Sequence, residues 1–176
     1  MATMPVRTAY LEMKTKPDKG PPEKIPNTII IETKPSIFFY RRLYGRIGTN
    51  YSWVDRNIMI DHDLARIIQD EKVNIFVLYV RGVIAGYTEL DRSYNNDIVL
   101  ANFGLMPEFI GRGLGKYLLA WTIHKAWRYN PDQLRVHTCE LDHPAALPNY
   151  IKAGFQIYDG KIIQQTIPDS RIVPGS

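Results

Sequence analysis

Three alternating glycines, Gly111, Gly113 and Gly115, stand directly in front of an apolar, helix-like segment. Glycine is unfavourable in regular structure because it loses more backbone freedom on folding than other residues do. A loop that leads from a strand into a helix leaves unpaired N–H groups that bind anions, and the helix dipole adds to the attraction. Arg112 and Lys116 place positive charge in the same segment. The pattern fits a phosphate-binding loop, or a glycine-rich turn without a ligand.

Spacing excludes two common phosphate-binding motifs. The dinucleotide fingerprint places its third glycine five residues after its first, whereas Gly115 follows Gly111 too closely. The P-loop requires a glycine five residues before a Gly-Lys-Ser/Thr triplet, but Ile110 occupies that position and Tyr117 follows Lys116. A bound pyrophosphate therefore requires a loop of another kind.

The loop resembles the acyl-CoA signature of the GNAT (GCN5-related) N-acetyltransferases, R/Q-x-x-G-x-G/A, which lies between a strand and a helix. The matching residues run from Ile110 to Gly115, within FGLMPEFIGRGLGKYLL. A second family motif, N-P-x-A-x-x-x-Y-x-x-x-G-F, is similar to HPAALPNYIKAGF, which runs from His143 to Phe155. The order of expected elements also matches the family, so the resemblance covers about residues 28–167.

The resemblance implies acetyl-CoA as cosubstrate and an α/β fold with a mixed, mainly antiparallel central sheet flanked by helices. The residues that it assigns to the cofactor are Leu105, Met106, Ile110, Gly111, Arg112, Gly113, Leu114, Gly115, Lys116 and His143. Ile110 replaces the usual Arg or Gln, so one side chain near the phosphates is missing while the backbone donors remain. Pro148 falls inside the second motif, where we expect it to loosen or kink a short helix.

The family mechanism, as the resemblance implies it, is direct attack of a neutral amine on the acyl-CoA thioester. Tyr150 occupies the position of the general acid, and a phenol with an ordinary pKa of about 10 is protonated at neutral pH. The alternative is a packing tyrosine. A bulge in the preceding strand would free a backbone N–H for the acyl carbonyl, which points to Gly104, Leu105 and Met106.

The general base is less well defined by the sequence. Glu89 and Asp97, at the ends of expected strands, are candidate bases, although most carboxylates are simply solvated. His137, Cys139 and His143 are nitrogen and sulfur ligands, but a structural zinc site needs four ligands and no fourth is evident, so we predict no metal.

The acceptor is predicted to be a primary amine of a small molecule or peptide. The first two helices wall the acceptor pocket in the family, and here the aromatics of FFYRRLYGRIGTNYSWVDR suit a flat or apolar acceptor. We expect Phe38 and Phe39 to be core residues. Asp55, Asp61 and Asp63 can attract a cationic amine, although helix capping explains Asp61 or Asp63 equally well. The alternative function is an acyl-CoA-binding module that senses or regulates without catalysis.

Hydrophobic periodicity and turn residues predict the elements between the motifs. Expected strands are 28–33, 73–80, 83–90, 97–105 and 134–140, and expected helices are 35–44, one capped at 61–63, 114–129 and 144–153. A final hairpin is predicted from 155–158 and 161–167, with Asp159 and Gly160 at the turn.

Residues 1–26, which contain KTKPDKGPPEKIP, are predicted to be a flexible Lys/Pro-rich extension ahead of a GNAT domain at 27–176. This extension carries five basic and three acidic side chains, half of the net charge of +4 of the 176-residue chain. The rest contains no dense basic block, which argues against nucleic acid.

Composition sets the remaining expectations. There is one cysteine, Cys139, so no intrachain disulfide forms and a cytoplasmic location is the simplest expectation. No apolar run reaches the roughly 20 residues of a membrane helix, and the N-terminus lacks a signal-like apolar core. We expect no membrane partner and leave a homodimer open.

Overall fold

The computed structural model describes residues 1–171, and within them seven strands form one sheet in the order β2-β3-β4-β5-β6-β1-β7. The strands are β1 (Ala2–Met13), β2 (Thr28–Thr33), β3 (Val73–Val80), β4 (Val83–Tyr94), β5 (Asp97–Leu105), β6 (Gln133–Cys139) and β7 (Gln156–Ile167). The β5–β6 pair is parallel, and the other neighbouring pairs are antiparallel. The predicted mixed, mainly antiparallel α/β fold is confirmed.

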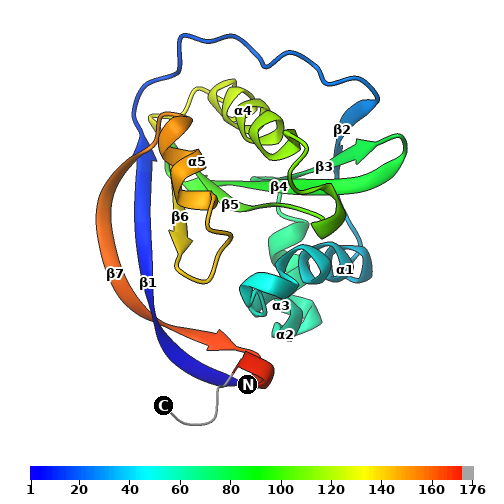
Figure 1. Ribbon diagram of the computed structural model, residues 1–176, viewed down its shortest axis with the longest axis vertical. Helices are drawn as coiled ribbons and strands as arrows, with labels where there is room; N and C mark the ends of the chain where they lie inside the picture. Colours follow the sequence, from blue (N-terminus) through cyan, green and yellow to red (C-terminus); the bar gives the residue numbers. More distant parts are fainter. Residues whose placement is uncertain (172–176) are drawn as a thin grey trace.

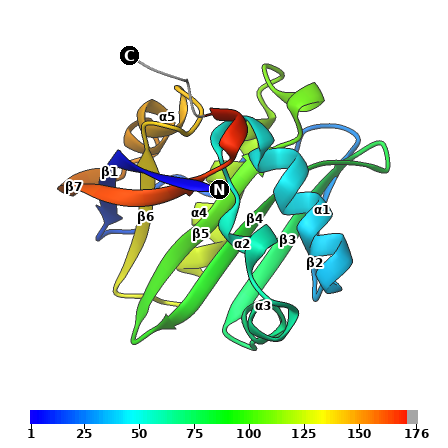
Figure 2. The ribbon, with the colours of Figure 1, turned by 90° about the horizontal axis from the view of Figure 1, so that it is seen from below.

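Helices cover both faces of this sheet (Figure 1). They are α1 (Ile37–Gly48), α2 (Asp55–Ile58), α3 (Asp61–Ile68), α4 (Leu114–Trp127) and α5 (Ala146–Lys152), with 3₁₀ turns η1 (Thr49–Tyr51), η2 (Pro107–Phe109) and η3 (Asp169–Arg171). Helices α1–α3 lie on one face, as Figure 2 shows from below, and α4 and α5 lie on the other. Within residues 1–171, no helix combines the length and apolar character needed to cross a membrane.

Local signals explain how the helices begin. Ser36 caps α1, because its hydroxyl accepts a hydrogen bond from the Phe39 N–H at 3.2 Å. The predicted cap of α3 is wrong: Ile60 holds the cap position, and Asp61 and Asp63 lie in the first turn. There their charge complements the helix dipole, and Asp61 pairs with Arg41 at 2.7 Å.

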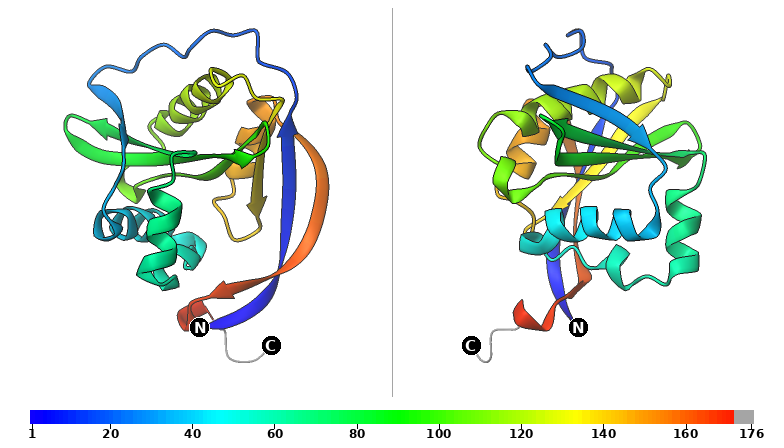
Figure 3. Two further views of the ribbon diagram at one scale, coloured as in Figure 1. Left: turned by 180° about the vertical axis from the view of Figure 1, so that it is seen from behind. Right: turned by 90° about the vertical axis from the view of Figure 1, so that its right-hand side faces the viewer.

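The first strand corrects the prediction for the N-terminus. Ala2–Met13 are not a flexible extension but form β1, which is inserted between β6 and β7 and pairs with both. Val6 and Leu11 are completely buried, and Met13 accepts a hydrogen bond from the Trp127 indole at 3.4 Å. Residues 14–27 contain no helix or strand and pass over the α4 side of the sheet to β2 (Figure 3). The predicted boundary at residue 26 therefore separates β1 from its own sheet.

The predicted C-terminal hairpin is also wrong. Residues 156–167 form one continuous strand, β7, which pairs along β1. Asp159 and Gly160 lie beside a register shift opposite Tyr10 and Leu11, so the turn signal marks a bulge instead of a reversal.

Strands β5 and β6 separate soon after they meet, and this separation positions the site. Their parallel pairing is confined to the first residues, from Asp97↔Gln133 to Val99↔Arg135. Immediately afterwards β5 contains a bulge, because Glu89 of β4 pairs with Asn102 while Leu90 pairs with Leu100. A bulge bends its strand and increases its twist, which carries the rest of β5 away from β6.

Candidate active site

A cleft of about 610 Å³ lies where β5 and β6 separate. Its walls come from β1, β5, β6, the end of β7, α1, η1, α2, α5, and α4 with its entry loop. The cleft has two parts. The part where the resemblance places the cofactor, called the cofactor half, comprises residues 103–105, 110, 111, 113, 115 and 116. The part where it places the acceptor, called the acceptor half, comprises Tyr44, Tyr51, Trp53, Asp55 and Asn102.

The glycine loop is a row of free backbone donors at the start of α4. Among the described residues, the N–H groups of residues 111–116 have no hydrogen-bond partner, and the first turn of α4 closes with Tyr117 N–H donating to Gly113 O. Gly111 and Gly113 have φ of +85° and +77°, which L side chains rarely adopt, and the space beside their Cα atoms is open. The predicted loop residues from Ile110 to Lys116 thus lie together, although Arg112 and Leu114 do not line the cleft.

Two further backbone donors face the gap from β5. Met106 N–H donates to Ala85 O at 2.8 Å, so Met106 is in a hydrogen-bonded pair with β4. Hydrogen-bonded and non-hydrogen-bonded pairs alternate along antiparallel strands, so Leu105 and Phe103 occupy non-hydrogen-bonded positions. Their N–H groups therefore point away from β4, toward the side that β6 has left. Of the three residues predicted to supply a free amide, only Leu105 does so. Phe103 was missed, because the predicted bulge at residues 104–106 actually lies at Ala101.

Tyr150 reaches the same cleft from α5. Its ring lies between Phe103 and Phe155, with centroids 6.4 and 5.9 Å away, and its side chain is buried. No described residue forms a hydrogen bond with its hydroxyl, which leaves that group available. Burial, with a smaller effect of Asp142, raises the pKa of Tyr150 above its ordinary value.

Pro148 does not disturb this arrangement, contrary to expectation. It is the third residue of α5, where the N–H groups have no partner within the helix, so the missing donor is not needed. The orientation of the Tyr150 side chain is therefore fixed by the helix and by its aromatic neighbours.

Comparison with known proteins agrees with this geometry. The model of the acetyltransferase (GNAT) family matches residues 40–155, which is more than half of the chain. The chain belongs to the GNAT acetyltransferase family. A search among curated proteins finds no match.

Solved GNAT structures share the fold at low identity. The GCN5-related N-acetyltransferase of Sphaerobacter thermophilus is 13% identical with a TM-score of 0.61, over 93% of this chain and 52% of that one. The IAA acetyltransferase of Bacillus cereus is 20% identical with a TM-score of 0.58, over 75% and 79%. An aminoglycoside acetyltransferase from an uncultured soil sample is 14% identical with a TM-score of 0.58, over 73% and 88%. This chain spans about half the length of the Sphaerobacter protein.

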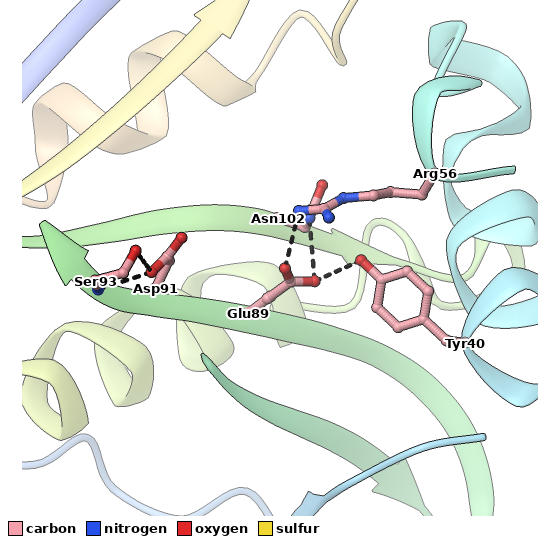
Figure 4. A network of polar contacts seen from close by, with 6 residues as sticks. All are labelled: Tyr40, Arg56, Glu89, Asp91, Ser93 and Asn102. Carbon is pink, nitrogen blue, oxygen red and sulfur yellow. Dashed lines mark hydrogen bonds and ion pairs between the residues drawn. The ribbon is translucent and has the colours of Figure 1, made fainter. Parts of the chain in front are cut away.

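Glu89, one of the two predicted bases of this GNAT domain, is the centre of a buried polar network (Figure 4). Its carboxylate accepts hydrogen bonds from Tyr40 Oη at 2.5 Å and Asn102 Nδ2 at 3.2 Å, and pairs with Arg56 at 3.2 Å. Glu89 is only 1% exposed and does not line the cleft. Burial, and then the Glu89 charge, raises the pKa of Tyr40, which keeps the phenol protonated as a donor. The network holds Asn102 and Arg56 in place, and its carboxylate has no direct route to a substrate.

Asp97, the other predicted base, lies at the opposite end of β5 from Leu105. It pairs with Arg135 at 3.0 Å and accepts a hydrogen bond from Gln133 Nε2 at 2.9 Å. Asp97 does not line the cleft. The structure therefore brings Tyr150 and the glycine loop together, but neither predicted carboxylate base with them.

The three residues considered as metal ligands line the cleft separately. His143 Nδ1 accepts a hydrogen bond from Ala145 N–H at 3.0 Å, and His137 lies against Tyr10, 5.8 Å between centroids. Burial raises the pKa of the Cys139 thiol, so the thiolate is disfavoured. Within residues 1–171 no three His, Cys, Asp or Glu side chains could hold a metal ion together.

The acceptor half is bridged to the α5 side of the cleft. Trp53 Nε1 donates to Asp142 Oδ1 at 3.1 Å, and the Tyr51 ring contacts the His143 ring edge-on at 5.9 Å. Asp142 also accepts from Thr138 Oγ1 and Cys139 N–H, which fixes the turn before α5. The acceptor wall and the helix that carries Tyr150 are thereby held at a fixed separation.

The aromatic residues of α1 differ from expectation in one case. Phe38, predicted to be core, is 71% exposed and lies under the Arg42 guanidinium, whereas Phe39 packs partly against the core. Tyr40 and Tyr44 are the buried aromatic residues of the helix, because the side that faces the sheet begins at Tyr40.

Proposed function

We propose that this protein transfers the acetyl group of acetyl-CoA to a primary amine. The observation that carries the proposal is one cleft that joins three kinds of group: free amides at a helix start, two outward-facing amides of β5, and the Tyr150 hydroxyl. The family and the acetyltransferases among its structural neighbours support the same reaction.

The loop fits the diphosphate of coenzyme A. The N–H groups of residues 111–116 converge on the start of α4, where the helix dipole favours an anion. Gly111 and Gly113 leave open the space that a Cβ would fill, so phosphate oxygens can approach the backbone. Lys116 lines the cleft and adds a positive charge, and the apolar Ile110 removes none of these donors.

The residues of the cleft divide the work of acyl transfer. Acetyl-CoA supplies an activated acyl carbon; the amine nitrogen bonds to it, and the carbon–sulfur bond then breaks. The Phe103 and Leu105 N–H groups face the gap as donors for the oxygen that gains negative charge. The Tyr150 hydroxyl donates a proton to the departing sulfur, and its raised pKa keeps that proton in place before transfer.

The amine proton requires a separate acceptor. Because Glu89 and Asp97 do not line the cleft, we propose that this proton passes to water in the acceptor half. An alkylammonium group has an ordinary pKa of about 10.4, so only a small fraction of the amine is reactive at neutral pH.

The alternative is a GNAT module that binds acyl-CoA without transferring it. The absence of Glu89 and Asp97 from the cleft lining is the observation that favours it. Release of the thiol with an amine present distinguishes the two functions, because a binding module produces none beyond slow hydrolysis.

The experiment pairs Gly113→Ala with Gly82→Ala, a matched control. Both glycines have positive φ, +77° and +78°, with no atom where a Cβ would lie, so strain of about 1–2 kcal/mol applies to each. Only Gly113 lines the cleft; Gly82 lies in the turn between β3 and β4. We expect calorimetry to show that Gly113→Ala binds acetyl-CoA at least tenfold more weakly than the wild type, whereas Gly82→Ala binds it normally. In a separate assay with a panel of amines, we expect the wild type to release the thiol. Equal affinities in the two variants would refute the loop assignment.

A further inference from the structure

The acceptor half contains one carboxylate that no described residue neutralises. Within residues 1–171, two carboxylates line the cleft, Asp55 and Asp142. Asp142 accepts hydrogen bonds from Trp53, Thr138 and the Cys139 amide. Asp55 is exposed, and no described residue forms a hydrogen bond or an ion pair with its carboxylate. Its neighbour Arg56 is turned inward to Glu89 and is not available to it.

Aromatic rings stand beside Asp55 in fixed positions. Tyr44 and Trp53 line the same part of the cleft with ring centroids 5.4 Å apart. Tyr44 is stacked on the buried Tyr40, and the indole of Trp53 is held by Asp142. Asp55 lines this cleft together with Tyr44, and its charge adds to the effect of burial in raising the pKa of Tyr44. A carboxylate beside aromatic faces is an arrangement that attracts a cation electrostatically.

The charges at the two parts of the cleft are opposite. Lys116 and the free amides of residues 111–116 make the cofactor half electropositive, whereas Asp55 makes the acceptor half electronegative. Asp55 comes from α2, on the face of the sheet opposite α4 and α5, which carry the loop and Tyr150 (Figure 1). The nitrogen that attacks must be neutral, so a group that stays charged at Asp55 is a second cationic group of the acceptor.

We propose that Asp55, with Tyr44 and Trp53, is a cation subsite, and that the acceptor is a diamine-type molecule that holds one charged amine there while the other is acetylated. This inference rests on the proposed acetyl transfer for the second amine. Asp55 can also interact with the dipole of α2, but that helix has only four residues, Asp55–Ile58, and leaves the adjacent aromatic pair unexplained.

A binding experiment tests the subsite without any chemistry. The probe is a bis-quaternary ammonium compound, a permethylated diamine that cannot be acetylated, titrated calorimetrically into the wild type, Asp55→Asn and Asp61→Asn. Asp61 is the control because it is also acidic and exposed, pairs with Arg41 and does not line the cleft. We expect the wild type and Asp61→Asn to bind alike, and Asp55→Asn to bind at least tenfold more weakly. No binding by the wild type, or equal binding by Asp55→Asn, would overturn the proposal.

A kinetic experiment tests the acceptor class. Thiol release is measured with a diamine and with the monoamine of equal length, and the ratio of their kcat/KM values should favour the diamine at least tenfold in the wild type. Asp55→Asn should remove most of that preference. A ratio unchanged by the substitution contradicts the assignment. Probe binding by the wild type with no thiol release from any amine supports the subsite and rejects the acetyltransferase function instead.

Discussion

The Tyr150 side chain lies between Phe103 and Phe155 with a hydroxyl that no described residue engages, and its role can be tested at a single oxygen atom. Tyr150→Phe keeps both ring contacts and removes the proton donor. We expect kcat to fall by well over tenfold, within the range of about 10²–10⁴ for a general acid, with little change in the KM for acetyl-CoA. Tyr158→Phe, on an exposed ring outside the cleft, is the control. Turnover near that of the wild type would remove Tyr150 from the mechanism.

The pH dependence of the same residue has a definite sign. Burial raises the pKa of Tyr150, so its hydroxyl stays protonated beyond the ordinary phenol value of about 10. Ionisation of Tyr150 should therefore cause no fall in the kcat of the wild type below about pH 10. A fall in kcat below that pH that is present in the wild type and absent in Tyr150→Phe would contradict this expectation.

Substitution of Glu89 tests whether its carboxylate is structural or acts as the base. Glu89→Gln leaves the largely buried Arg56 guanidinium without its counter-charge. We expect the unfolding free energy to fall by about 3 kcal/mol. This value is at the low end for a buried pair, because the Arg56 side chain is 18% exposed. Glu108→Gln, in an exposed pair with Arg46, should cost about 0–1 kcal/mol. Urea unfolding measures both values.

Kinetics on the folded Glu89→Gln variant complete that test. If the amine proton goes to water, the acid limb of kcat/KM should follow the ionisation of the amine and keep its midpoint in Glu89→Gln. A limb that disappears with the substitution would make Glu89 the base.

At the scale of elements, the sequence predicts most of what positions the cofactor half. Strand β3 and the strand leading into the loop match their predicted bounds, because apolar runs and turn residues there agree with the tertiary pairing. The glycine loop is predictable because positive φ leaves a chemical signature in the choice of residue.

The acceptor half is less predictable, because it depends on contacts between distant residues. Trp53 meets Asp142 across the cleft, and Asn102 meets Glu89 from a neighbouring strand, and no local pattern encodes either pair. The bulge at Ala101, which decides which amides face the gap, likewise appears only from the pairing of β4 with β5.

The turn signal at Asp159 and Gly160 was misleading for the same reason. This dipeptide favours a hairpin when the flanking segments must pair with each other. Here β1 offers a partner along the whole of β7, and the long-range pairing overrides the local preference.

At the scale of the whole molecule, β1 is the feature that sequence reasoning missed. The charged and proline-rich residues 14–26 dominate the composition of the first 26 residues and mask the apolar side chains of Val6, Leu11 and Met13, which are buried. Taken alone, Ala2–Met13 contains enough β-branched, aromatic and apolar residues to suggest a strand.

A pair of substitutions tests whether β1 is part of the folded domain. Leu11 is completely buried, so Leu11→Ala should lower the unfolding free energy by about 2–5 kcal/mol. Lys16→Ala, in the exposed connection between β1 and β2, should change it by less than about 0.5 kcal/mol. Urea unfolding that shows equal stabilities would indicate that β1 does not pack as described.

The position of β1 also has a consequence for biosynthesis. Thr3 pairs with Thr166, so β1 is translated long before its second neighbour exists. At about 5–20 residues per second, that interval is roughly ten to thirty seconds on the ribosome. During this time Leu11 and its apolar neighbours are not stably buried. Nascent chains of this protein should therefore depend on ribosome-associated chaperones until β7 has emerged from the exit tunnel.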